Sequence, residues 1–125
     1  NSMQVTRLYS GSDGESHFED IEVSLQEAGA GALSRQLPVE SLFLRTTPTD
    51  YEPARHLAPR RQFIINLDGE VEIEAGATTR RFGPGTIIFA EDLTGRGHVT
   101  RDVGGARQSV VIPVPDDFDL DRLRS

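Results

Sequence analysis

Residues 56–75 read HLAPRRQFIINLDGEVEIEA and decide the fold class, because much of this stretch alternates with a period of two. Over 70–75, glutamates alternate with apolar residues, which is typical of a strand with one solvated and one buried face. Residues 63–67 are apolar except for Asn66 and lead into Asp68-Gly69, a dipeptide that favours a hairpin turn. The stretch therefore predicts two adjoining β-strands.

The same period continues outward along the chain. Gly83-Pro84-Gly85 marks a turn, since glycine permits tight bends and proline fixes one backbone dihedral. Only 26–33 and the tail at 117–123 are compatible with a helix. Many short strands separated by Gly and Pro turns predict an all-β sandwich or barrel. Further strands are expected at 21–25, 42–45, 80–82, 86–90 and 109–114.

Bulk properties narrow the class of protein. The 125 residues suit one domain, predicted over 4–125, with the two residues before Met3 expected to be a cloning remnant. The net charge of −7 argues against nucleic-acid and anionic-membrane partners. There is no cysteine, which excludes thiol nucleophiles and zinc–thiolate sites. No apolar run reaches the length of a membrane span, so a cytoplasmic protein is expected.

Polar residues share one face of the strand region after His56. In an extended chain, alternate side chains point the same way, so His56 and Gln62 are expected to face one interior. Arg60 and Asn66 have the same parity. A line of polar groups inside a strand is costly unless its members are satisfied. The opposite face, with Phe63, Ile65 and Leu67, is apolar, which suits a barrel with a binding site in its lumen.

These residues resemble the first motif of the cupin superfamily, G-x5-H-x-H-x3-E-x6-G. His56 and Gly69 match the motif, whereas Asp50 replaces its first glycine, Ala58 its second histidine and Gln62 its glutamate. The resemblance implies a double-stranded β-helix, the RmlC-like jelly-roll barrel of the cupins.

The second cupin motif, G-x5-P-x-G-x2-H-x3-N, is similar to 85–102 if two residues are inserted. Gly95 and His98 match, with Glu91 in place of the proline and Asp102 in place of the asparagine. Residues 13–18 and 90–98 also resemble a group of small single-domain cupins of undetermined function.

The resemblance implies a divalent transition metal, which three histidines and a carboxylate typically hold in cupins. Here the ligand candidates are His56, Gln62 and His98, and an amide is a weaker, neutral donor. Glu91 or Asp92 would have to supply an anion, or His17 a third imidazole. The preferred reading is a metal-free pocket in which the histidines bind a ligand or satisfy each other.

Other candidates have a functional and an ordinary interpretation. Glu91 and Asp92 either belong to a solvated loop or orient His98 as a general base. Arg60 or Arg61 either binds an anionic group at the pocket mouth or is a surface arginine. His17 lies in a polar stretch and is expected at the surface.

The leading hypothesis is a small-molecule-binding protein with His56, Gln62 and His98 as polar contacts. Any catalysis is expected to be proton transfer or isomerisation of a small carbonyl or carboxylate compound. A metal-dependent dioxygenase-like enzyme and a non-enzymatic ligand sensor are the alternatives. The apolar face at 63, 65 and 67 requires cover, and a homodimer is expected.

Overall fold

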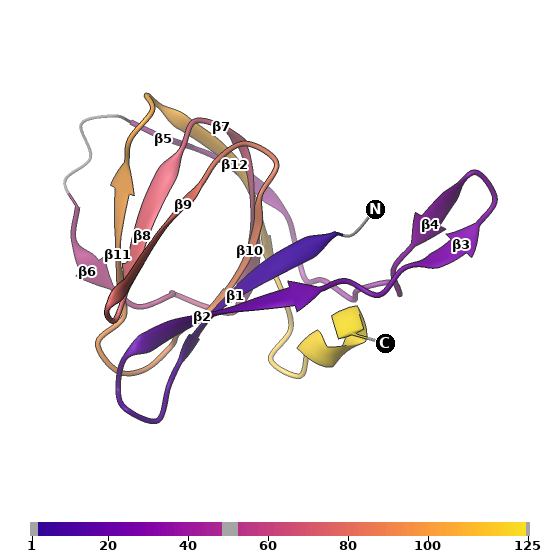
Figure 1. Cartoon of the computed structure of the whole chain (residues 1–125), viewed down its shortest axis with the longest axis horizontal. Coiled ribbons are helices and arrows are strands. Elements are labelled where there is room, and N and C mark those ends of the chain that lie inside the picture. Colours follow the sequence, from indigo (N-terminus) through magenta and orange to yellow (C-terminus); the bar gives the residue numbers. More distant parts are fainter. Residues whose placement is uncertain (1–2, 49–52, 125) are drawn as a thin grey trace.

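The computed structural model describes residues 3–48 and 53–124, which form two facing β-sheets, a projecting hairpin and a short 3-10 helix (Figure 1). The strands are β1 (Gln4–Ser10), β2 (Ser16–Glu22), β3 (Gln26–Ala28), β4 (Gly31–Leu33), β5 (Phe43–Thr47), β6 (Arg55–His56), β7 (Gln62–Asp68), β8 (Val71–Ala75), β9 (Thr78–Phe82), β10 (Ile87–Glu91), β11 (His98–Asp102) and β12 (Arg107–Pro113), followed by η1 (Leu120–Arg124).

The strand order confirms the predicted jelly roll. One sheet has the order β2-β1-β10-β7-β12-β5 and the other has the order β6-β11-β8-β9. From β5 to β12 the chain crosses repeatedly between the sheets, and among the described strands of this stretch only β8 and β9 are consecutive in one sheet. Eight strands wound in this way into two four-stranded layers form the double-sheet jelly roll. Strands β1 and β2 extend the larger sheet, because β1 pairs in parallel with β10.

Apolar side chains form two cores, one on each face of the larger sheet. The inner cluster lies in the sandwich and includes Leu8, Ile73 and Ile88, each no more than 4% exposed. The outer cluster includes Phe63 and Phe89 and is covered by the C-terminal segment through Phe118 and Leu123. One face of β7 thus contributes Phe63 to the outer core, and its other face lines the cavity with Gln62 and Ile64. The C-terminal segment docks on the outer core by its apolar residues.

Two local predictions from the sequence were wrong. Residues 26–33, judged compatible with a helix, form the β3–β4 hairpin, because Gly29 turns the chain with a φ of 64°. Asp68-Gly69 does not close a hairpin: β7 and β8 lie in different sheets, and the dipeptide is a corner between them. The tail has only a single short turn of helix, at Leu120–Arg124, within the predicted region 117–123 and one residue beyond it.

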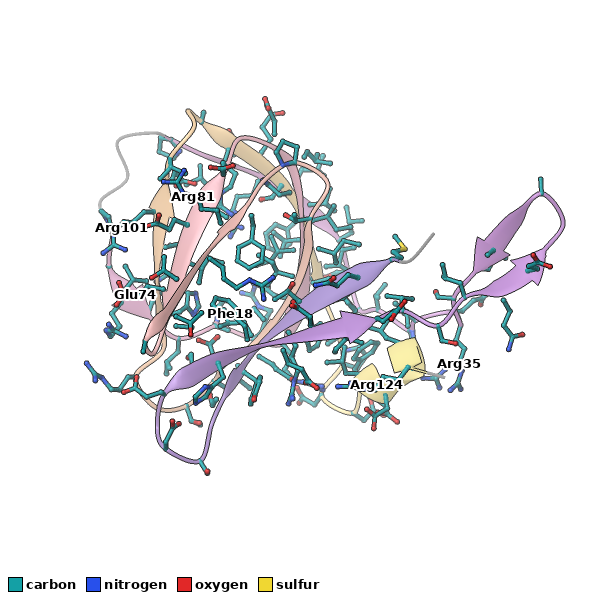
Figure 2. All side chains as sticks on the ribbon, in the orientation of Figure 1. Phe18, Arg35, Glu74, Arg81, Arg101 and Arg124 are labelled. Atoms are coloured by element: carbon teal, nitrogen blue, oxygen red, sulfur yellow. The ribbon has the colours of Figure 1, made fainter. Side chains whose placement is uncertain are left out.

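The outer face of the four-stranded sheet is charged, as the glutamates of β8 predicted. Figure 2 shows Glu74, Arg81 and Arg101 on this side of the molecule, away from the interior. Arg81 pairs with Glu72 at 3.4 Å and Arg101 with Glu74 at 3.5 Å. Among the described residues, no helix has the length and apolar character needed to cross a membrane.

Candidate functional site

A cavity of about 320 Å³ opens between the two sheets and is the candidate site. This central cavity lies at the lower end of the range of roughly 300–1,000 Å³ that is usual for small-molecule pockets. Its buried lining combines apolar residues with the polar side chains of Gln62, His98 and Arg107. The lining residues are Leu8, Phe43, Arg45, Thr47, His56, Ala58, Pro59, Arg60, Gln62, Ile64, Ile73, Ile88, Ala90, His98, Thr100 and Arg107.

Strand pairing brings the two predicted histidines together. His56 of β6 is the direct antiparallel partner of His98 of β11, and their ring centroids are 4.4 Å apart in an edge-to-face arrangement. Gly97 permits this approach, with a φ of 77° that favours glycine. A Cβ at this position would lie 2.2 Å from the carbonyl oxygen of His56.

The carboxylate of Asp92 accepts a hydrogen bond from the His98 ring. The Asp92 side chain is fully buried, and its Oδ2 accepts hydrogen bonds from Nδ1 of His98 at 2.6 Å and from the hydroxyl of Ser16 at 2.7 Å. Of the two carboxylates predicted to orient His98, the structure therefore places Asp92 beside the ring. Ser16, at the start of β2, had no distinguishing signal in the sequence, because only the tertiary fold brings β2 to the loop after β10.

The hydrogen bonds fix the same tautomer for both histidines. Nδ1 of His56 lies 3.0 Å from the carbonyl oxygen of Ala54, which can only accept, so this nitrogen carries a proton. An ionised Asp92 imposes the same condition on Nδ1 of His98. In the neutral rings, Nε2 is then an acceptor, and both rings line the cavity.

Gln62 and Arg60 form a second polar pair in the lining. The Nη1 of Arg60 donates to Oε1 of Gln62 at 2.9 Å, and the Gln62 side chain is buried. Because guanidinium groups are donors only, this contact assigns the oxygen of Gln62 and leaves its amide N–H groups as donors. Ala58 also lines the cavity, where its methyl group adds apolar surface.

Two predicted residues lie away from the cavity. Asn66 is buried at the β7–β8 corner, where its Nδ2 donates to the carbonyl oxygens of Gly69 and Phe82, so its predicted role in ligand binding is not supported. His17 pairs with Asp13 at 3.0 Å on the exposed surface, as expected. Asp50, matched to the first cupin glycine, lies outside the described residues.

Glu91 points to a different set of partners from Asp92. Its carboxylate accepts hydrogen bonds from Arg7 and Arg61 outside the cavity, so it does not orient His98. Burial lowers the pKa of Arg7, but its hydrogen bonds to Glu91 and Glu19 outweigh this effect and raise it above its usual value. Successive residues of an extended chain point to opposite sides, which separates Glu91 from its neighbour.

The structure adds two arginines that the sequence reasoning did not single out. Arg45 of β5 and Arg107 of β12 both line the cavity. Arg107 is paired with Asp102 at 2.8 Å, and both side chains are nearly buried. Asp102, which replaces the asparagine of the second cupin motif, thus positions a cavity arginine. No local pattern in the sequence identifies this pair.

The available donors do not fit a divalent transition metal. The cavity offers two imidazoles and an amide whose oxygen already accepts a hydrogen bond from cationic Arg60. Asp92 and Glu91 both have other partners, so neither compensates the charge of an ion between the rings. Within 3–48 and 53–124 no cluster of three or more His, Cys, Asp or Glu residues has the geometry to hold a metal ion.

The strand order defines a double-sheet jelly roll with a cavity between its sheets. No protein-family model and no curated protein sequence matches the chain. Two solved structures are similar over most of its length. The cupin domain of Cnp3 from Schizosaccharomyces pombe is 13% identical, with a TM-score of 0.48, over 91% of this chain and 84% of that one. A putative ethanolamine utilization protein Q from Salmonella typhimurium is 10% identical, with a TM-score of 0.46, over 94% of this chain and 99% of that one.

Proposed function

We propose that the chain binds a small carbonyl or carboxylate compound in the central cavity and moves a proton on it with His98 as general base. The buried hydrogen bond between Asp92 and His98 is the observation that carries this proposal. An imidazole whose Nδ1 is held by a carboxylate presents a lone pair at Nε2 and gains electrostatic support once it is protonated.

Each polar side chain of the lining has a separate part in this chemistry. Nε2 of His98 accepts a proton from the carbon next to the substrate carbonyl, and the carboxylate of Asp92 stabilises the resulting imidazolium. The amide N–H groups of Gln62 donate to the substrate oxygen, on which negative charge develops. His56 lies against the His98 ring and offers a second Nε2 to the ligand. The same proton, returned to another carbon of the substrate, completes an isomerisation.

Deuterium exchange tests the proposal without knowledge of the full reaction. A panel of small ketones, aldehydes and keto acids is incubated with the protein in D2O, and loss of the α-proton signals is followed by NMR. We expect exchange with at least one compound, lowered about 100-fold or more by His98→Gln, a typical effect of losing a general base. His17→Gln removes an exposed imidazole and should leave the rate unchanged.

Asp92→Asn tests positioning through a second measurement. We expect slower exchange together with changed ¹⁵N shifts of the His98 ring, because the charge at Oδ2 is lost. Exchange by no compound, or exchange that survives His98→Gln, would contradict the proposal, and ligand binding without exchange would favour a sensor. Stoichiometric metal in protein purified without an affinity tag, lost in His56→Ala and His98→Ala, would instead support a metal-dependent enzyme.

A further inference from the structure

The cavity is basic in an acidic chain. The full sequence has 20 acidic and 13 basic residues, and its net charge is −7. Nevertheless, the cavity lining includes three arginines at 45, 60 and 107 and both cavity histidines, and no aspartate or glutamate of the described residues lines it. The charge of the lining is therefore opposite to that of the molecule as a whole.

Arg60 is the cavity arginine whose positive charge is available to an anionic ligand. Arg107 is neutralised by Asp102, so its charge is already used within the fold. Arg60, by contrast, forms no ion pair with any residue in 3–48 or 53–124, and its hydrogen bond goes to the neutral amide of Gln62. That bond uses one N–H of Nη1 and leaves further guanidinium donors for a ligand.

Gln62 gives this guanidinium a defined orientation. The side chain of Gln62 is only 3% exposed, so the acceptor that holds Arg60 is itself fixed in the packed interior. A guanidinium held by one acceptor binds a planar carboxylate with less loss of side-chain freedom than a mobile one, because part of its orientation is already set. This fixed orientation is more typical of an arginine that binds an anion than of a solvated surface arginine.

Part of the buried lining is apolar. Leu8, Ile73 and Ile88 line the cavity and are at most 4% exposed, alongside the buried polar groups of Gln62, His98 and Arg107, whereas Arg60 is exposed. A ligand that contacts both Arg60 and this apolar surface has an anionic group and an apolar part.

We infer that the central cavity binds a small carboxylate with a short apolar chain, its carboxylate at Arg60 and its chain against Leu8, Ile73 and Ile88. The inference rests on the proposed function in one respect only, namely that the same cavity is the functional site. It specifies the substrate class as an amphipathic organic anion.

Binding of simple probes tests this assignment by isothermal titration calorimetry at low salt. Hexanoate is the probe, with hexanamide as its neutral and hexylamine as its cationic counterpart, and butyrate as its shorter homologue. We expect hexanoate to bind at least tenfold more tightly than either counterpart. We also expect it to bind roughly tenfold more tightly than butyrate, because two more CH₂ groups are buried.

Two charge-matched variants locate the carboxylate. Arg60→Gln keeps a donor for Gln62 and should lower the affinity for hexanoate at least tenfold. Arg81→Gln, on the outer face of the four-stranded sheet, should leave that affinity unchanged. An ¹H–¹⁵N spectrum of each variant verifies that it is folded. No hexanoate binding, equal binding of hexanamide or hexylamine, or an unchanged affinity in Arg60→Gln would overturn the inference.

The outcomes separate this inference from the proposed function. Hexanoate is bound and not converted, so its affinity does not depend on catalysis. Preferential carboxylate binding without proton exchange on any panel compound supports the anion site and contradicts the general base. Proton exchange on neutral ketones without preferential binding of carboxylates supports the general base and contradicts the anion site.

Discussion

Asp92 has an unusual environment for a carboxylate, because both of its hydrogen bonds fall on one oxygen. Oδ2 accepts from His98 and Ser16, while the buried Oδ1 has no partner among the described residues. A buried charge with an unsatisfied oxygen is costly. This unfavourable burial occurs beside His98. Among the described residues, His98 is the only histidine that both contacts a carboxylate and lines the cavity. This concentration of cost at one histidine fits a chemical role for the pair.

Glu19 predicts a dependence of stability on pH. Hydrogen bonding from Arg7, supported by Arg124, holds the pKa of Glu19 below its usual value. A lowered folded-state pKa stabilises the protein above the unfolded pKa of about 4.3, and this contribution is lost as the pH falls through the folded value. We expect Glu19→Gln to make the fall in unfolding free energy below about pH 4.3 less steep. The difference should be below about 1 kcal/mol for a partly exposed pair.

Urea unfolding at pH 6, 4 and 3 measures the effect of this substitution. Glu27→Gln, on the exposed β3–β4 hairpin, is the control. A pH profile of Glu19→Gln parallel to that of the unchanged protein would show that the Arg7 contact contributes nothing measurable.

At the scale of elements, the short pairing of β6 with β11 depends on one glycine. Gly97→Ala would place a methyl group 2.2 Å from the His56 carbonyl oxygen, so a backbone shift must add to the cost of the positive φ. Gly85→Ala has a similar φ of 86° but nothing within 4 Å of the added atom. We expect Gly85→Ala to cost about 1–2 kcal/mol and Gly97→Ala clearly more.

Thermal unfolding of both variants tests this order, and the ring contact of His56 with His98 offers an independent readout by NMR. Equal losses in the two variants would mean that the close approach of β6 and β11 is not required for stability.

The C-terminal segment predicts a second effect at this scale. Leu123 is 2% exposed and packs in the outer core, whereas Leu33 on the projecting hairpin is 63% exposed. Leu123→Ala should cost about 2–5 kcal/mol, and Leu33→Ala about 0.5 kcal/mol or less. Chemical denaturation gives both values, and a loss below 1 kcal/mol in Leu123→Ala would show that the tail is not part of the core.

At the scale of the whole molecule, the homodimer remains a prediction, and the structure offers one exposed apolar surface as its candidate interface. Leu44, Val110 and Ile65 lie in one cross-strand row over β5, β12 and β7, and Leu44 is 73% exposed. Beyond this row, Leu67 is 53% exposed. A second copy covering this face would remove apolar surface from water.

Light scattering at micromolar concentration should give about twice the chain mass of 13.7 kDa. Leu44→Lys should give the monomer mass, and Leu93→Lys, at a loop leucine that is 42% exposed, should not. A monomer mass for the unchanged protein would contradict the prediction.

The same scales separate what can be predicted from the sequence. Period-two alternation over 70–75 and the turn residues predicted strands and an all-β class, because a strand's two faces are set by adjacent residues. His56, Ala58, Arg60, Gln62 and Ile64, which share one parity in the sequence, all line the cavity, as does Pro59 of the opposite parity. Parity failed at Asn66, where the chain turns the corner between the sheets and the side chain bonds to the turn instead.

The features that follow from the sequence alone are therefore the alternating faces, the glycine turns and the charge of the chain. The carboxylate that supports His98 is identified by the fold and not by the sequence, because Asp92 and Glu91 are adjacent in the chain but point to opposite sides of one strand end. The fold also brought Ser16 to Asp92 and closed the lining with Arg45 and Arg107. These contacts join residues from strands far apart in sequence, and a pattern of neighbours along a chain carries no information about which distant strands will meet.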